Sequence, residues 1–156
     1  AYFHIPIPEY VNLLNDDPIY GINGEGIWCP VVNTGFFAAA KANGDITAMF
    51  CGHDHNNDFG GWHDGIELVY GRKSGYQVYG DRHGARVVVP KQNYDSNRKL
   101  TITREHYIVD ISGSLVYTSP VSRKQGVTQK QCLSGNSLFS HAQKIIVIVL
   151  VLLCLL

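Results

Sequence analysis

One short motif has the residue types and the spacing to bind a metal ion, Gly52-His53-Asp54-His55. Neutral imidazole is a good ligand for zinc, iron and manganese. Two imidazoles that lie two residues apart at the end of a strand can point into one crevice, and Gly52 tolerates the backbone angles of a sharp turn. A His-x-His pattern alone is a weak signal, because surface and core histidines also produce it.

His4 strengthens the metal interpretation, because it also follows a short apolar run that is typical of a buried strand. Residues 45–51, just before the motif, alternate in the manner of a second buried strand. If the two strands are parallel neighbours, their carboxyl ends meet at one edge of the sheet. In a two-metal site the ions lie about 3.5–4 Å apart. The rigid turn can then give one histidine to each ion, with Asp54 facing away or holding the backbone.

The elements that must position these histidines follow from hydropathy and turn signals. A helix is predicted over 34–42, with Thr34 as its N-cap and Asn43-Gly44 as its end. A helix, a turn and a short buried strand that ends in polar residues form the layout of an α/β site. The other predicted elements are a short helix over 9–14 and strands over 1–7, 66–70, 85–89, 100–111 and 115–118.

Composition and charge restrict the partners. The apolar fraction is 45%, which is enough for a buried core. Lysine plus arginine and aspartate plus glutamate number 13 each, so the chain has no long-range field for nucleic acid, and we expect no nucleic-acid partner. An anionic substrate must therefore be held by metals or by a few aimed donors.

The four cysteines contain no Cys-x-x-Cys pair, which argues against a zinc knuckle or a thioredoxin-like motif. Cys154 lies in an apolar tail. The other three, Cys29, Cys51 and Cys132, could include one disulfide and one free thiol, or all three could be buried free thiols. The sequence does not decide between these alternatives.

The C-terminal tail raises the possibility of membrane attachment. Residues 145–156 are all apolar, whereas a helical span needs about 20 residues. The small residues 134–136, a polar spacer and the apolar run match the layout of a lipid-anchor signal; a buried core segment and a shortened membrane span are the alternatives. We expect a domain over 1–118, a polar linker over 119–143 and an apolar tail over 144–156, in a secreted or membrane-anchored protein.

Four segments in order resemble the C-terminal part of the calcineurin-like metallophosphoesterases, and most closely the purple-acid-phosphatase-like branch. They are residues 1–10, 33–37, 52–59 and 70–76, and the resemblance covers roughly residues 1–90. It implies an α/β (α+β) fold that is the C-terminal part of a four-layer β-sandwich flanked by helices. It also implies hydrolysis of a phosphoester, in a small molecule or a phosphoprotein.

The resemblance implies roles for particular residues. His4 and His53 would share one metal ion and His55 would bind its neighbour, with two divalent or mixed-valence ions of iron, manganese or zinc. Four further residues are predicted to support the ligands or face the substrate, although a role in turns is an equal or stronger alternative for several of them. They are Asp54, Asn56, Asp58 and Arg72.

The chain departs from the family upstream of His4. The family's Asp-x-His, Gly-Asp-x-x-Asp and Gly-Asn-His-Asp/Glu motifs precede the strand-end histidine, and only three residues do so here. The chain is therefore expected to be an incomplete portion of a phosphatase, inactive and poorly folded by itself. The alternatives are a non-catalytic fragment and a remnant that binds a single metal ion.

Overall fold

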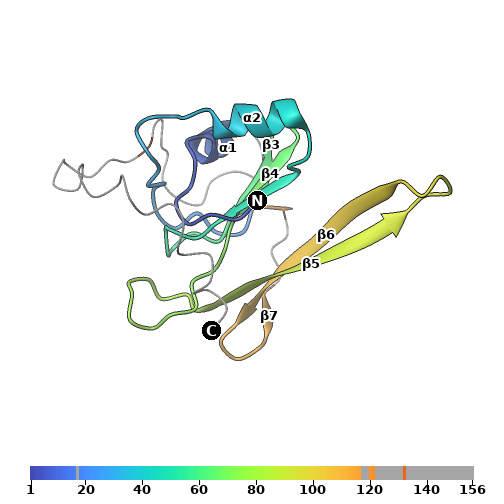
Figure 1. Ribbon diagram of the computed structural model, residues 1–156. Helices are drawn as coiled ribbons and strands as arrows, with labels where there is room; N and C mark the ends of the chain where they lie inside the picture. Colours follow the sequence, from blue (N-terminus) through green and yellow to red (C-terminus); the bar gives the residue numbers. More distant parts are fainter. Residues whose placement is uncertain (17, 117–119, 122–131, 133–156) are drawn as a thin grey trace.

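The computed structural model describes residues 1–16, 18–116, 120–121 and 132, and it shows a mixed α+β fold built from two sheets (Figure 1). The helices α1 (Glu9–Asp16) and α2 (Phe36–Asn43) lie on the same face of the larger sheet. The smaller sheet forms a long arm that extends away from this body. The predicted α/β character is confirmed in this coarse form.

The larger sheet has the strand order β2-β4-β3-β1-β8. Its strands are β1 (Ile19–Tyr20), β2 (Ala48–Cys51), β3 (Gly60–His63), β4 (Ile66–Tyr70) and β8 (Pro120–Val121). The N-terminal segment lies parallel to β2, because Tyr2 bridges Phe50 and the amide of Phe3 donates to the Phe50 carbonyl at 3.0 Å. The parallel neighbours expected from the sequence are therefore present.

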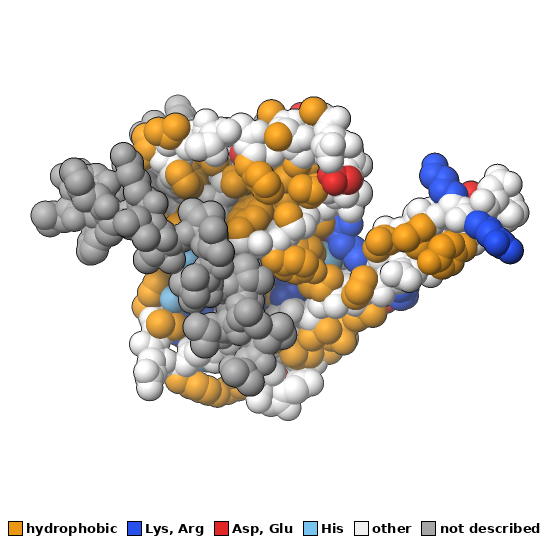
Figure 2. Space-filling model, in the orientation of Figure 1, with side chains coloured by type: hydrophobic (Ala, Val, Ile, Leu, Met, Phe, Trp, Pro, Cys, Tyr) orange, Lys and Arg blue, Asp and Glu red, His pale blue; other side chains and the backbone are white. Residues whose placement is uncertain are grey.

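The smaller sheet consists of β5 (Gly84–Tyr94), β6 (Leu100–Asp110) and β7 (Leu115–Val116). β5 and β6 pair antiparallel along their whole length, from Gly84 opposite Asp110 to Tyr94 opposite Leu100. The base of this arm lies against the sheet face opposite the helices, where Val88 packs on Phe50 and Val69. Its outer half is exposed, and Figure 2 shows hydrophobic side chains along it.

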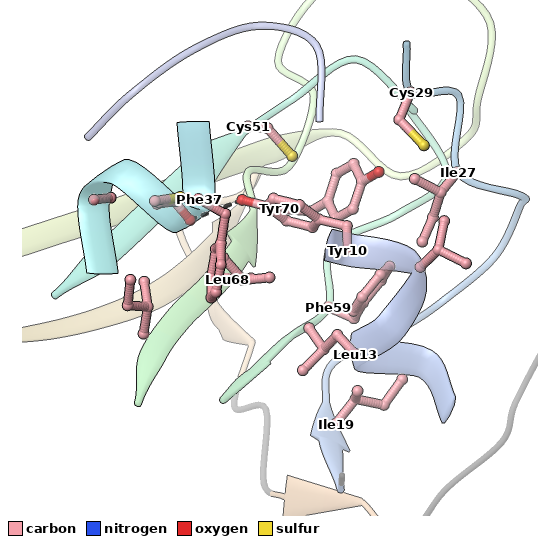
Figure 3. Packing of buried hydrophobic residues seen from close by; sticks show 14 residues of the cluster. Tyr10, Leu13, Ile19, Ile27, Cys29, Phe37, Cys51, Phe59, Leu68 and Tyr70 are labelled. Carbon is pink, nitrogen blue, oxygen red and sulfur yellow. Dashed lines mark hydrogen bonds between the residues drawn. The ribbon is translucent and has the colours of Figure 1, made fainter. Parts of the chain in front are cut away.

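The main hydrophobic core lies between the two helices and the larger sheet (Figure 3). Alternation along the strands produces it: in β2, Met49 and Cys51 face the helices, whereas Ala48 and Phe50 face the arm. The Tyr10 hydroxyl on α1 donates to the Met49 carbonyl at 2.8 Å, so the buried phenol has a partner.

Two local expectations need correction. The helix begins at Phe36 with Gly35 as its N-cap, not Thr34, because Gly35 adopts the left-handed conformation with φ 80°. The strand β3 was not predicted, since two glycines weaken its pattern. Asp64 and Gly65 both have positive φ, and they form the tight Asp-Gly turn that pairs β3 with β4. The predicted helix end is confirmed, because Gly44 caps α2 in the left-handed conformation.

Within the described residues, no helix is long and apolar enough to cross a membrane. The tail predicted over 144–156 lies outside these residues. So does the linker predicted over 119–143, apart from 120–121 and 132.

A disulfide joins Cys29 to Cys132, and Cys51 is a buried free thiol. This selects one of the alternatives that the sequence left open, and it closes a span of 103 residues.

Cys132→Ser is expected to lower the free energy of unfolding by about 2–4 kcal/mol, because the long loop is then unconstrained in the unfolded chain. Denaturant titration checks this value. Reductant should destabilise the parent protein by a similar amount and leave the variant unchanged; equal sensitivity of both to reductant would contradict the assignment.

Candidate metal centre

The structure brings His4 and His53 into direct contact at the carboxyl ends of two adjacent strands. His4 Nε2 lies 3.2 Å from His53 Nδ1, and the two rings meet edge to face with centroids 5.0 Å apart. The backbone holds this pair in place, because the Gly52 amide donates to the His4 carbonyl at 3.2 Å. Residues 49 positions apart in the chain are thus held together by one parallel strand pairing.

The geometry of this pair fits two ligands of one metal ion. Nitrogen ligands lie about 2.0–2.1 Å from zinc, so two of them on a tetrahedral ion are separated by roughly 3.3 Å. The observed 3.2 Å between the two ring nitrogens agrees with this separation. Across the described part of the chain, however, no group of three His, Cys, Asp or Glu side chains is arranged to hold a metal ion.

Electrostatics favour the neutral, metal-binding form of both imidazoles. Partial burial is the largest cause that lowers the pKa of His4, and the nearby His53 and His55 lower it further. Partial burial and His55 likewise lower the pKa of His53, although Glu25 opposes the shift. A ring that stays neutral keeps a lone pair for a metal ion, because protonation competes with coordination.

His55 lies within electrostatic range of the pair and has its own contacts. Its ring stacks on Tyr79, with centroids 4.4 Å apart and an interplanar angle of 22°. Its Nδ1 lies 3.3 Å from the Tyr79 carbonyl oxygen. The backbone amide of His55 donates to the Tyr79 hydroxyl at 3.3 Å. The second histidine of the motif is therefore held by the segment that follows β4.

Asp54 turns away from the histidine pair and is buried. Its Oδ2 accepts from the Tyr70 hydroxyl at 2.5 Å and from the Trp28 amide at 3.2 Å. Burial raises the pKa of Asp54 to about 6, against these two hydrogen bonds, which lower it. Its Oδ1 has no hydrogen-bond partner among the residues described. This placement agrees with a carboxylate that holds the backbone between the two histidines.

Asp58 and Arg72 form a buried ion pair. Arg72 donates to Asp58 Oδ2 from Nε at 3.1 Å and from Nη2 at 2.5 Å, and Asp58 Oδ1 accepts from the Ile22 amide at 2.8 Å. Asn56 bonds through its backbone: its amide donates to Glu25 Oε1 at 2.7 Å, and its carbonyl accepts from Arg82. These contacts stabilise the loops around the histidines, and the substrate-facing roles predicted for Asn56, Asp58 and Arg72 stay predictions.

Three residues that contact the site were not among the predicted site residues. The carboxylate of Glu25 accepts from the backbone amide that follows His55, and the ring of Tyr79 stacks on His55. The buried ammonium group of Lys73 donates to the carbonyls of Val78, Tyr79 and Gly80. The ammonium group of Lys73 has three protons and three acceptors, so it is fully used in shaping its loop. For Lys73 and Tyr79, the signal in the sequence was a charged residue among the glycines and tyrosines of 70–80.

The known proteins that this chain resembles in sequence are named as phosphatases. The chain is 43% identical over 96 residues to "Probable inactive purple acid phosphatase 29" of Arabidopsis thaliana, covering 60% of this chain and 25% of that protein. It is 36% identical over 66 residues to "Phosphatase DCR2" of Saccharomyces cerevisiae, covering 38% and 11%. It is 46% identical over 48 residues to "Serine/threonine-protein phosphatase CPPED1" of Danio rerio, covering 31% and 15%. No protein-family profile and no solved structure matches the chain.

The curated relatives are thus purple acid phosphatase-like proteins and other phosphatases, which supports the resemblance to metallophosphoesterases. The chain spans a quarter or less of the length of each of these relatives, at 25%, 11% and 15%. Three of the matched relatives carry the word "inactive" in their names, and two are named as phosphatases without that word.

Proposed function

We propose that this chain is the C-terminal portion of a metal-dependent phosphoester hydrolase of the calcineurin-like, purple-acid-phosphatase-like kind. The contact between His4 and His53 carries the proposal, because a 3.2 Å separation at adjacent strand ends suits two ligands of one ion. The phosphatase names of the relatives support the same reading. The substrate would be a phosphoester in a small molecule or a phosphoprotein.

The three histidines would hold the ions. His4 and His53 would bind one and His55 the second, each ion being iron, manganese or zinc. When bound, such a pair supplies Lewis-acid stabilisation of the charge on the phosphoryl group. Asp54 would keep the turn between His53 and His55 rigid through Tyr70 and the Trp28 amide.

The described cations beside the site are committed to the scaffold. Lys73 is bound to three carbonyls, and Arg72 forms two hydrogen bonds to Asp58. Drawing either residue onto a substrate would leave buried partners unsatisfied, which is costly. Substrate charge is therefore expected to be neutralised mainly by the metal ions.

Chelation tests the proposal on the protein as it is expressed, with any residues that flank this chain. Hydrolysis of p-nitrophenyl phosphate is expected to disappear after dialysis against a strong chelator and to return on addition of Zn²⁺, Mn²⁺ or iron. The reason is that both ions act on the reacting phosphoryl group. Hydrolysis that survives chelation, with no metal left in the protein by elemental analysis, would reject the proposal.

A second candidate is a non-catalytic protein that binds a single metal ion. Two observations favour it: three of the matched relatives are named "inactive", and His4 and His53 suffice for part of one coordination shell. This candidate predicts about one Zn²⁺ per chain by calorimetry and no hydrolysis of any phosphoester. The binuclear enzyme predicts two ions and turnover.

We further propose that the protein is secreted or membrane-anchored. The disulfide between Cys29 and Cys132 supports an oxidising compartment, because such bonds are rare in proteins of the reducing cytosol. The apolar residues 145–156 would provide the attachment. Fractionation of cells that express the protein with and without 145–156 tests this: membrane association should require the tail, and equal distribution of both forms would refute its role.

A further inference from the structure

We propose that Tyr79 and Glu25 are positioning residues that clamp the imidazole of His55 in one orientation and one tautomer. The inference deepens the proposed function, because it assigns residues that prepare His55 to bind a metal ion. It concerns a side-chain arrangement that exists without the ion, so it can be tested apart from catalysis.

The clamp holds His55 through three contacts with Tyr79. The phenol ring lies against the imidazole, at 4.4 Å between centroids and 22° between planes. The Tyr79 carbonyl lies 3.3 Å from His55 Nδ1, and the Tyr79 hydroxyl accepts from the His55 backbone amide at 3.3 Å. A stacked face and an edge hydrogen bond together restrict both rotation and tilt of the imidazole.

The carbonyl contact selects the tautomer. A carbonyl oxygen only accepts hydrogen bonds, so His55 Nδ1 must carry the proton and donate it to Tyr79. The lone pair of the neutral ring is then on Nε2, the ring nitrogen that the Tyr79 carbonyl does not contact. Metal-binding histidines usually donate their other ring nitrogen to a carbonyl or carboxylate in this way, which fixes the ring and raises its basicity.

Glu25 ties the clamp to the histidine turn. Its Oε1 accepts from the Tyr79 hydroxyl at 3.1 Å and from the Asn56 amide at 2.7 Å. One carboxylate oxygen therefore joins the loop that carries Tyr79 to the residue that directly follows His55. The Tyr79 hydroxyl thus donates to Glu25 and accepts from the His55 amide, so its hydrogen-bonding roles are both used.

Lys73 gives the Tyr79 carbonyl its position. The buried ammonium donates to that carbonyl at 2.8 Å and to the carbonyl of Val78 at 2.9 Å, and it also contacts the Gly80 carbonyl. A carbonyl oxygen has two lone pairs, so Tyr79 can accept from both Lys73 and His55. The segment from Val78 to Gly80 is thus folded around a cation before any ligand is present.

The test uses three variants in the protein as expressed. Tyr79→Leu removes the stack and the hydroxyl, and Tyr79→Phe removes the hydroxyl alone. Glu25→Ala removes the oxygen that accepts from the Tyr79 hydroxyl and the Asn56 amide. Matched controls are Tyr94→Leu and Glu105→Ala, which make the same changes on the exposed arm. Zn²⁺ affinity by calorimetry is the first measurement, and the ¹⁵N shifts of the His55 ring in the metal-free protein at alkaline pH are the second.

Tyr79→Leu is expected to weaken Zn²⁺ binding by about 10–100-fold, the usual effect of removing a residue that orients a metal-binding histidine. Tyr79→Phe should recover most of that loss, and the controls should bind as the parent does. In the parent the ring shifts should show the proton on Nδ1. Tyr79→Leu keeps the backbone carbonyl but loses the stack that holds the imidazole beside it, so its ring shifts should move toward a mixture of tautomers.

A proton on Nε2 in the metal-free parent protein would overturn the inference. So would parent-like Zn²⁺ affinity and parent-like ring shifts in Tyr79→Leu. If Tyr79→Leu fails to fold, Tyr79→Phe and Glu25→Ala still test the inference. Both keep the stack and the carbonyl, so the proton should stay on Nδ1, and a proton on Nε2 in either would contradict selection by the carbonyl. Zn²⁺ affinity equal to that of the parent in Glu25→Ala would show that Glu25 is not part of the clamp. A parent protein that binds no Zn²⁺ but shows the Nδ1 proton would reject the proposed function and leave the clamp in place.

Discussion

His53→Ala is expected to abolish high-affinity metal binding, with a loss of more than about 100-fold in Zn²⁺ affinity. Removing an outer residue that only orients a ligand already costs 10–100-fold, and a direct ligand should cost more. His53 is the central residue of the site, since its Nδ1 lies 3.2 Å from His4 Nε2 and His55 is two positions away. Hydrolysis of phosphoesters should fall together with metal content.

Calorimetry with Zn²⁺ and elemental analysis of the purified variant measure this effect. His63→Ala is the matched control, because it removes an imidazole from β3 next to the start of β4, whereas the histidine motif follows Cys51, which pairs with the end of β4. The control should retain the metal. Parent-like metal content in His53→Ala would show that the histidine pair is not a metal site, whatever the activity of the protein.

Glu67→Gln is expected to lower the free energy of unfolding by about 3–5 kcal/mol, the usual cost of removing one partner of a buried charge pair. Glu67 Oε2 accepts from Arg104 Nη2 at 2.7 Å and from Nε at 3.1 Å. Its Oε1 accepts from the Tyr20 hydroxyl at 2.8 Å. In Glu67→Gln, the side-chain NH₂ group would face groups that donate to the carboxylate in the parent, and the charge of Arg104 would lose its partner.

The same carboxylate holds the arm against the larger sheet through His106. Arg86 Nη1 donates to His106 Nδ1 at 2.9 Å, so in the neutral ring the proton lies on Nε2 and is donated to Glu67 at 3.0 Å. Arg86 and His106 belong to β5 and β6, whereas Glu67 belongs to β4. Loss of the carboxylate should therefore loosen the base of the arm, which hydrogen exchange can detect.

Glu67 also predicts the response to acid. Burial disfavours its ionised form, but hydrogen bonds from His106, Tyr20 and Arg104 outweigh burial and lower its pKa from 4.5 to about 2. The folded state thus binds this proton less readily than the unfolded chain. The stabilisation is complete above about pH 4.5 and is lost as the pH falls toward 2.

Denaturant titrations from pH 7 down to pH 2 check both effects, with Glu105→Gln as the control. Glu105 pairs with Lys91 on the exposed arm, and such surface pairs contribute less than about 1 kcal/mol. The Glu67→Gln variant should be less stable than the parent at pH 7. Its free energy of unfolding should also fall less steeply below pH 4.5 than that of the parent, because it lacks the carboxylate that takes up the proton. A loss below 1 kcal/mol would mean that Glu67 does not hold the two sheets together.

The sequence alone identified the features that depend on neighbours in the chain. The apolar alternation before Gly52 predicted β2, and Gly44 predicted the end of α2, because both signals act within a few residues. Histidines at the ends of two apolar strands predicted that His4 lies near the His53-Asp54-His55 turn, since parallel strands end at the same edge, and the family resemblance named His53 as its partner. The segments quoted for the family resemblance agree with the phosphatase relatives.

Only the tertiary structure decided which distant residues meet. Glu25 and Tyr79 are separated by 54 residues, and Glu67 and Arg104 by 37, so no local pattern could pair them. The sequence left the pairing of Cys29, Cys51 and Cys132 open, and the fold joined Cys29 to Cys132 and buried Cys51 as a free thiol. An unpaired charge inside a protein is strongly disfavoured. Lys73 and Glu67 can be buried because the folded chain places hydrogen-bond and ion-pair partners around them.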